Sequence, residues 1–66
     1  MKSYIHTEIL NGNKWEVVIF YDRSLRLWTV LSYRNDKQLH SAEYYNNKNE
    51  LSELYDLKTF TVEGGK

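Results

Sequence analysis

Apolar and polar side chains alternate along the first two thirds of the chain with the period of two that is typical of β-strands. This alternation predicts strands over residues 3–10, 14–21 and 25–33, and a fourth strand over residues 38–45. The segments between the first three strands contain Asn, Gly, Asp and Ser, which favour tight turns. The pattern therefore predicts an antiparallel meander.

The turns between strands determine which side chains share a face, because a shift of one residue moves every side chain to the other side of the sheet. A three-residue turn over residues 22–24 would place Tyr21 opposite Leu25 and Ile19 opposite Leu27. The strongest apolar positions of both strands would then lie together. The same requirement predicts a three-residue loop with a glycine bulge in the first hairpin, which puts the odd-numbered residues of the first strand on that face.

A short helix is predicted after the fourth strand. Asn47 is a good N-cap residue, and Glu50 stands three positions later, as in a capping box. Leu51, Leu54 and Tyr55 form an apolar stripe at helical spacing. A helix of about 10 residues is unstable alone in water. We therefore expect the stripe to pack on the odd-numbered face of the second strand.

The last segment, residues 58–62, is rich in β-forming residues and predicts either a final strand or an extended tail over the core. Together these elements predict an α+β fold, an antiparallel four- to five-stranded β-meander sheet with one short helix packed on one face. Residues 1–63 are expected to form a single small domain, and residues 64–66 a flexible tail.

One helix covers one face of such a sheet, but the other face is also predicted to be apolar. Burying that cluster would remove several hundred Å² from water, which contributes on the order of 5–10 kcal/mol before entropy costs. The alternative is that this cluster is itself the core, either under the helix or inside a small barrel. The residues predicted to contact a partner on this even-numbered face are Val18, Phe20, Arg26, Trp28, Val30, Arg34 and Tyr44.

Composition limits the chemistry that this chain can perform. Nine Lys plus Arg balance nine Asp plus Glu, which argues against a polybasic nucleic-acid or membrane binder. The absence of Cys and the presence of two His give no basis for a disulfide, a zinc site or another cofactor. No serine stands in a nucleophile motif. We therefore expect a cytoplasmic protein that is not an enzyme and carries no metal.

Three segments resemble the AP2-like domains at the N-termini of phage-type integrases. They are Lys14-Trp15-Glu16-Val17, Phe20-Tyr21-Asp22 and the helix-opening run from Tyr45 to Leu51. The resemblance implies three strands followed by a helix over about residues 12–57. The sheet of that family is basic whereas this chain is neutral, so the resemblance concerns the architecture only.

These observations predict a small protein-binding module that acts by occlusion. Its expected partner is another protein, a second copy of itself through the exposed sheet face, or both. The concrete form is a phage-type inhibitor or regulator of a larger host or defence enzyme, similar to anti-CRISPR proteins. The alternative is a nucleic-acid-binding module in which Trp28 and Phe20 stack on bases and arginines hold phosphates.

Overall fold

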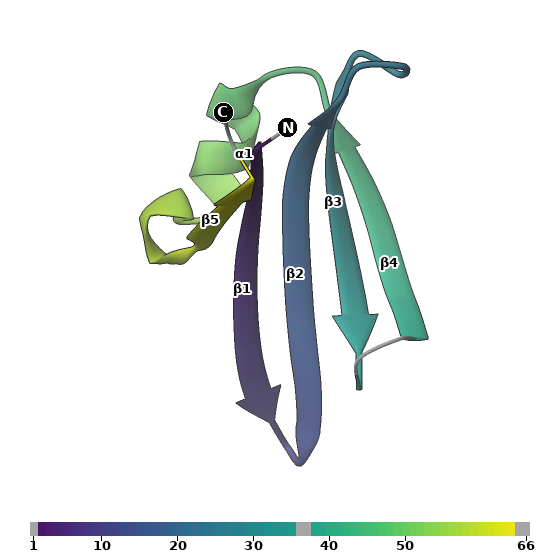
Figure 1. The fold of residues 1–66 in the computed structure, drawn as a ribbon, viewed down its shortest axis with the longest axis vertical. Helices are drawn as coiled ribbons and strands as arrows, with labels where there is room; N and C mark the ends of the chain where they lie inside the picture. The colour runs from purple at the N-terminus through teal and green to yellow at the C-terminus, as the bar shows by residue number, and fades with distance from the viewer. Residues whose placement is uncertain (1, 36–37, 65–66) are drawn as a thin grey trace.

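The computed structural model describes residues 2–35 and 38–64 of the chain. They form one antiparallel sheet of five strands in the spatial order β4-β3-β2-β1-β5, with one helix on one face (Figure 1). This confirms the predicted α+β meander with a short helix. The elements are β1 (Lys2–Leu10), β2 (Asn13–Asp22), β3 (Leu27–Arg34), β4 (Gln38–Tyr45), α1 (Lys48–Leu54), the 3-10 helix η1 (Leu57–Thr59) and β5 (Thr61–Gly64).

The first hairpin has a two-residue turn. Asn11 and Gly12 both have positive φ, 51° and 79°, which is the conformation of a type I′ turn. The predicted three-residue loop is therefore wrong. As a result Tyr4 lies opposite Ile19 and His6 lies opposite Val17, so the even-numbered residues of β1 share a face with the odd-numbered residues of β2.

The second turn contains four residues because Asp22 caps it. The Asp22 carboxylate accepts hydrogen bonds from the backbone N–H groups of Ser24 and Leu25, at 2.9 and 3.2 Å. The Asp22 carbonyl also accepts one from the N–H of Arg26 at 2.7 Å. Arg26 has a φ of 58°, which closes the turn in the left-handed region. Strand β3 therefore begins at Leu27.

The four-residue turn changes the register between β2 and β3 from the predicted one. Tyr21 lies opposite Trp28 and Ile19 lies opposite Val30, not opposite Leu25 and Leu27. The even-numbered residues of β3 thus share a face with the odd-numbered residues of β2. The residues of β3 that were predicted for one face of the sheet therefore lie on the other face.

The helix begins as its sequence predicts. The Asn47 side chain accepts a hydrogen bond from the Glu50 N–H at 3.0 Å, and Glu50 Oε2 accepts one from the Asn46 N–H at 3.3 Å. Leu51, Ile19 and Val30 form the buried core and are 0%, 0% and 1% exposed. The predicted packing of the helix on the odd-numbered face of β2 is confirmed.

The helix is shorter than predicted and ends at Leu54, because Tyr55 has an extended backbone, with φ −129°. Leu54 is 63% exposed, so its predicted place in the buried stripe is wrong. The chain then crosses the sheet through η1 and reaches β1, where β5 pairs antiparallel with residues 2–5. Gly64 belongs to β5, and the rest of the predicted tail lies outside the described residues.

Candidate functional site

The two faces of the sheet are packed differently. We call the side that carries α1 and η1 the covered face. Its strand residues include Ile19 and Val30, which contact Leu51 of the helix. The partly buried side chains packed against this core, Tyr4, Val17, Trp28, Tyr45, Tyr55, Leu57 and Phe60, all come from the covered face or from the segment that crosses it.

The opposite side of the sheet, which we call the open face, is also apolar. Its residues alternate with those of the covered face, and in the described part of the chain no helix lies over it. None of its apolar residues belongs to the buried core. They are Ile5, Ile9, Val18, Phe20, Leu27, Leu31, Tyr33, Leu39, Ala42 and Tyr44.

The structure divides the predicted partner-binding residues between the two faces. Val18, Phe20 and Tyr44 lie on the open face, as expected. Trp28 and Val30 lie on the covered face, because the register of β3 differs by three residues from the predicted one, and an odd shift exchanges the faces. Trp28 packs against the core and meets the Tyr21 ring edge-on, with 5.6 Å between ring centroids.

The predicted arginines also lie away from the open face. Arg34 is opposite Trp15 on the covered side, and its guanidinium donates a hydrogen bond to Gln38 Oε1 at 3.3 Å. Arg26 is in the turn between β2 and β3. The prediction that Trp28 and Phe20 form one surface between two arginines is therefore wrong. Leu27 and Leu31 occupy the β3 positions on that surface instead.

One polar side chain is buried in the middle of the open face. Thr29 is 3% exposed, and its hydroxyl has no hydrogen-bond partner. Its cross-strand neighbours are Phe20 and Tyr44, whose rings are large enough to shield a small side chain between them. A buried hydroxyl without a partner costs about 1–3 kcal/mol. The neighbouring side chains therefore shield the centre of the open face, at Thr29, from solvent.

Most of the charged residues on the open face are acidic. Glu16, Asp22 and Glu63 lie on this side of β2 and β5, and Lys14 lies on the same side at the end of β2. Three carboxylates beside an apolar patch give it a negative rim. Such a rim favours a partner with basic groups and disfavours phosphates.

A second cluster lies at the end of the covered face farthest from α1. The Trp15 ring meets the His40 ring edge-on at 4.9 Å, and Trp15 lies between Glu8 and Arg34 in the sheet. The sequence alternation put Trp15 on the face that the helix covers, but the helix is too short to reach it. His40 forms no hydrogen bond with a serine among the described residues, so the cluster offers no activated nucleophile.

A carboxylate joins the end of the helix to β4. Glu43 Oε1 accepts hydrogen bonds from the Tyr55 hydroxyl at 2.7 Å and from the Tyr45 hydroxyl at 3.2 Å. Burial and the neighbouring Glu43 raise the pKa of Tyr55 to about 12, and the same two causes raise the pKa of Tyr45. This contact holds α1 over the sheet.

The Tyr55 contact predicts a loss of stability in alkaline solution. The folded state holds the Tyr55 proton more tightly than the unfolded chain does, because the pKa is raised from 10.0 to about 12. The stabilisation is thus complete below pH 10.0 and is lost as the pH rises through about 12. We expect Tyr55→Phe to lower the free energy of unfolding by about 1 kcal/mol at neutral pH and to weaken its alkaline decline.

Urea unfolding at neutral and alkaline pH measures this effect. Tyr44→Phe is the matched control, because its ring is 51% exposed on the other side of the sheet. An equal effect of both substitutions on the alkaline decline would contradict the assignment to Tyr55.

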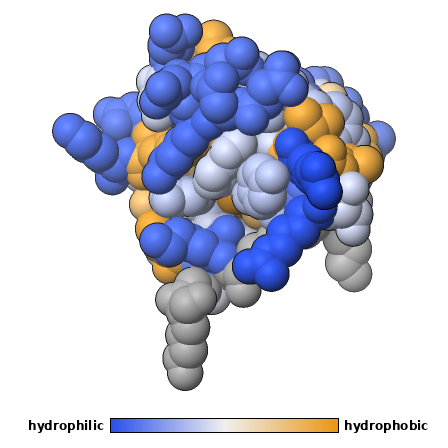
Figure 2. Space-filling model, turned by 90° about the horizontal axis from the view of Figure 1, so that it is seen from above, coloured by the Kyte–Doolittle hydropathy of each residue, from blue (hydrophilic) through white to orange (hydrophobic). Residues whose placement is uncertain are grey.

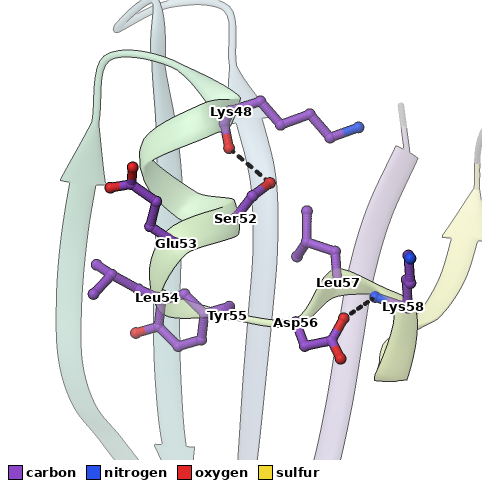
Figure 3. A pocket seen from close by; sticks show the side chains of 8 residues that line it. All are labelled: Lys48, Ser52, Glu53, Leu54, Tyr55, Asp56, Leu57 and Lys58. Atoms are coloured by element: carbon purple, nitrogen blue, oxygen red, sulfur yellow. Dashed lines mark hydrogen bonds between the residues drawn. The ribbon is translucent and has the colours of Figure 1, made fainter.

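A surface hollow of about 640 Å³ lies beside the helix (Figure 3). Two of its polar side chains form local hydrogen bonds. The Ser52 hydroxyl donates to the Lys48 carbonyl at 3.1 Å, and the Asp56 carboxylate accepts from the Lys58 N–H at 3.1 Å. The lining side chains all come from one continuous segment, residues 48–58. The hollow therefore brings no distant residues together for catalysis.

Metal-ligating residues do not gather in the described part of the chain. His6 Nε2 lies 3.2 Å from Glu8 Oε1, but no group of three or more His, Cys, Asp or Glu is present there. Two ligands from one strand do not hold a metal ion.

The exposed area of the chain is larger than the average for its mass. The protein exposes 4981 Å², compared with about 4,450 Å² for a typical monomer of 8.0 kDa. Seen from one end of the sheet, hydrophilic residues dominate the surface and hydrophobic residues lie at its sides (Figure 2).

The fold and this surface define a small α+β domain whose sheet is covered by a helix on one face and open on the other. No family model, curated protein or solved structure matches this chain. The resemblance to the integrase AP2-like domains thus has no support beyond the order of the elements. Within the described residues, no helix has the length and apolarity needed to cross a membrane.

Proposed function

We propose that this protein is a small protein-binding module whose open face is its contact surface. The observation that carries the proposal is the presence of two apolar sheet faces and one covering helix. Val18, Phe20 and Leu31 lie at adjacent positions near the centre of the open face. An apolar patch of several hundred Å² that is bordered by polar residues is typical of a protein interface.

The energy available on this face is sufficient for specific binding. Burial of apolar surface contributes about 25 cal/mol per Å², so 400 Å² would contribute on the order of 10 kcal/mol before the costs of association. Phe20, Tyr33 and Tyr44 supply aromatic rings, which dominate the binding energy of many interfaces. The open face therefore has the aromatic composition that is typical of the centre of a protein–protein interface.

A protein partner is favoured over a nucleic acid. The arginines that would hold phosphates lie in a turn and on the covered side, while Glu16 and Asp22 lie beside the apolar patch. Carboxylates next to the stacking rings would repel a phosphate backbone. The negative rim instead favours a basic protein surface.

We further propose that the protein acts by occlusion, in the cytoplasm, as an inhibitor or regulator of a larger enzyme. A chain of 66 residues that holds a flat apolar face can cover a functional surface without chemistry of its own. The absence of Cys fits a reducing compartment. A phage-type inhibitor of a host or defence enzyme, similar to anti-CRISPR proteins, is the concrete form of this proposal.

Site-specific photo-crosslinking tests the contact surface. A benzophenone amino acid replaces Tyr33 on the open face and, as the matched control, Tyr21 on the covered face; both rings are partly buried. We expect irradiation of expressing cells to give a protein adduct from position 33 and none from position 21. Val18→Lys should abolish the adduct while circular dichroism shows an unchanged fold.

Other outcomes would contradict the proposal. Adducts of equal yield from both positions would mean that the partner does not bind the open face in preference to the covered face. An adduct with nucleic acid, together with binding of a fluorescent oligothymidylate at low salt, would establish the alternative function.

A further inference from the structure

The outer edge of β4 is an unprotected strand edge. β4 is one of the two outermost strands, and Figure 1 shows no segment beyond it at the right of the sheet. It has eight residues, whereas β5 at the other edge has four. Strand edges are usually protected by Lys, by Pro, by a β-bulge or by a covering segment, because unpaired backbone groups bind other strands. β4 has a bulge at His40, and residues 41–45 beyond it are regular. Residues 38–45 contain no Lys, Arg or Pro.

The side chains along this edge are apolar on one side. Leu39 and Tyr44 are 55% and 51% exposed, and Ala42 lies between them on the open-face side of β4. On the covered side, Glu43 and Ser41 lie opposite Val30 and Ser32 of β3. Another strand added here would therefore extend both the apolar open face and the polar side of β4.

We propose that β4 pairs antiparallel with β4 of a second copy of this chain, about a twofold axis at Ala42. The bulge in β4 gives the strand one extra residue, His40, between the residues opposite Ser32 and Tyr33. In this pair, Ala42 of one copy lies opposite Ala42 of the other. Because His40 is an extra residue, Tyr44, two positions after Ala42, lies opposite Leu39, three positions before Ala42 in the other copy.

The same register also keeps the Glu43 carboxylates of the two copies apart. Glu43 of each copy faces the bulged pair Ser41 and His40 of the other copy, so a carboxylate meets a hydroxyl and an imidazole. No like charges oppose each other. A register centred on Glu43 would instead place two carboxylates in direct opposition, which destabilises a strand pair. The apolar pairing of Tyr44 with Leu39 and the absence of opposed like charges thus favour a second copy in the Ala42-centred register as the occupant of this edge.

The pairing has a consequence for the open face. A twofold axis perpendicular to the sheet leaves both open faces on the same side of a continuous ten-stranded sheet. Two open faces would then form one apolar surface of twice the length. The pairing uses open-face residues only at the β4 edge and leaves Val18 and Phe20 at its centre free, so it does not require that this centre bind a protein.

The unpaired part of the outer edge of β1 provides the control for the β4 edge. β5 pairs with β1 only up to Ile5, so the outer edge of β1 from His6 to Leu10 is also unpaired. This edge has five residues and contains Glu8, and Ile9 on it is 73% exposed. Ile9→Lys therefore adds the same charge at an exposed apolar position on the competing edge.

Sedimentation equilibrium over roughly 5–500 µM, a range suited to a weak dimer, tests the proposal. We expect the wild-type mass to rise from 8.0 kDa toward twice that value. Leu39→Lys and Tyr44→Lys should each raise the dissociation constant at least about tenfold, because a charge replaces an apolar cross-strand contact twice per dimer. Ile9→Lys and Val18→Lys should leave it within about twofold of the wild type.

Hydrogen exchange identifies the paired strand directly. Amides of residues 41–45 should exchange about tenfold more slowly at the highest concentration than at the lowest, and those of residues 6–10 should not change. A monomer at every concentration would overturn the proposal. So would a dimer that Ile9→Lys dissociates, or one that Val18→Lys dissociates, since these would place the second copy on β1 or on the open face.

Discussion

Replacing Leu51 by alanine is expected to unfold a large fraction of the protein at 25 °C. Leu51 is fully buried and is the helix residue in a core that otherwise consists of Ile19 and Val30. Leu→Ala substitutions at such sites cost about 2–5 kcal/mol. A domain of 66 residues has a total stability of about 3–10 kcal/mol. The loss is therefore comparable to the whole free energy of unfolding.

Urea unfolding followed by circular dichroism and tryptophan fluorescence measures this loss. Leu54→Ala is the control, because Leu54 lies in the same helix and is 63% exposed. It should change the free energy of unfolding by less than about 0.5 kcal/mol. Equal losses for Leu51→Ala and Leu54→Ala would mean that the helix does not pack on the sheet as described.

Replacing Trp28 by alanine is expected to destabilise the fold by about 3 kcal/mol, because the indole packs against the core on the covered face. The substitution also removes the edge-on contact with Tyr21 at 5.6 Å. Such ring pairs contribute about 0.5–1.5 kcal/mol beyond their buried area. Trp28 is thus a structural residue, and its loss should weaken folding rather than remove a contact surface.

Tyr44→Ala is the matched aromatic control on the other face. Its ring is 51% exposed at the edge of the sheet, so we expect a loss below about 1 kcal/mol in the same urea experiment. A larger loss for Tyr44→Ala than for Trp28→Ala would mean that the open face, and not the covered face, contains the core.

Several elements could be predicted because their signals are local. Asn47 and Glu50 are three residues apart, and their hydrogen bonds form within one turn of helix. The alternation of side chains likewise predicted all four strands of the meander and the burial of Ile19. These features depend on neighbouring residues, so a single sequence contains them.

The candidate surface could be predicted only in part. The sequence indicates two apolar faces and one helix, and it places Val18 and Phe20 on the open face. The choice between Trp28 and Leu31 as their neighbour depended on the length of one turn. The Asp22 carboxylate stabilises a turn of four residues by accepting hydrogen bonds from two backbone N–H groups in it. The alternation of apolar and polar side chains does not specify the backbone conformation of turn residues, so it could not predict this length.

The sequence was sufficient to predict the four strands of the meander, the helix with its cap and a second apolar face. Which side chains form that face, the pairing of β5 with β1 and the position of β4 at a free edge became known only from the folded chain. The physical reason is the period of two along a strand. Each strand presents two possible faces, and only the turns and the packing of Leu51 against Ile19 and Val30 select which of them is covered.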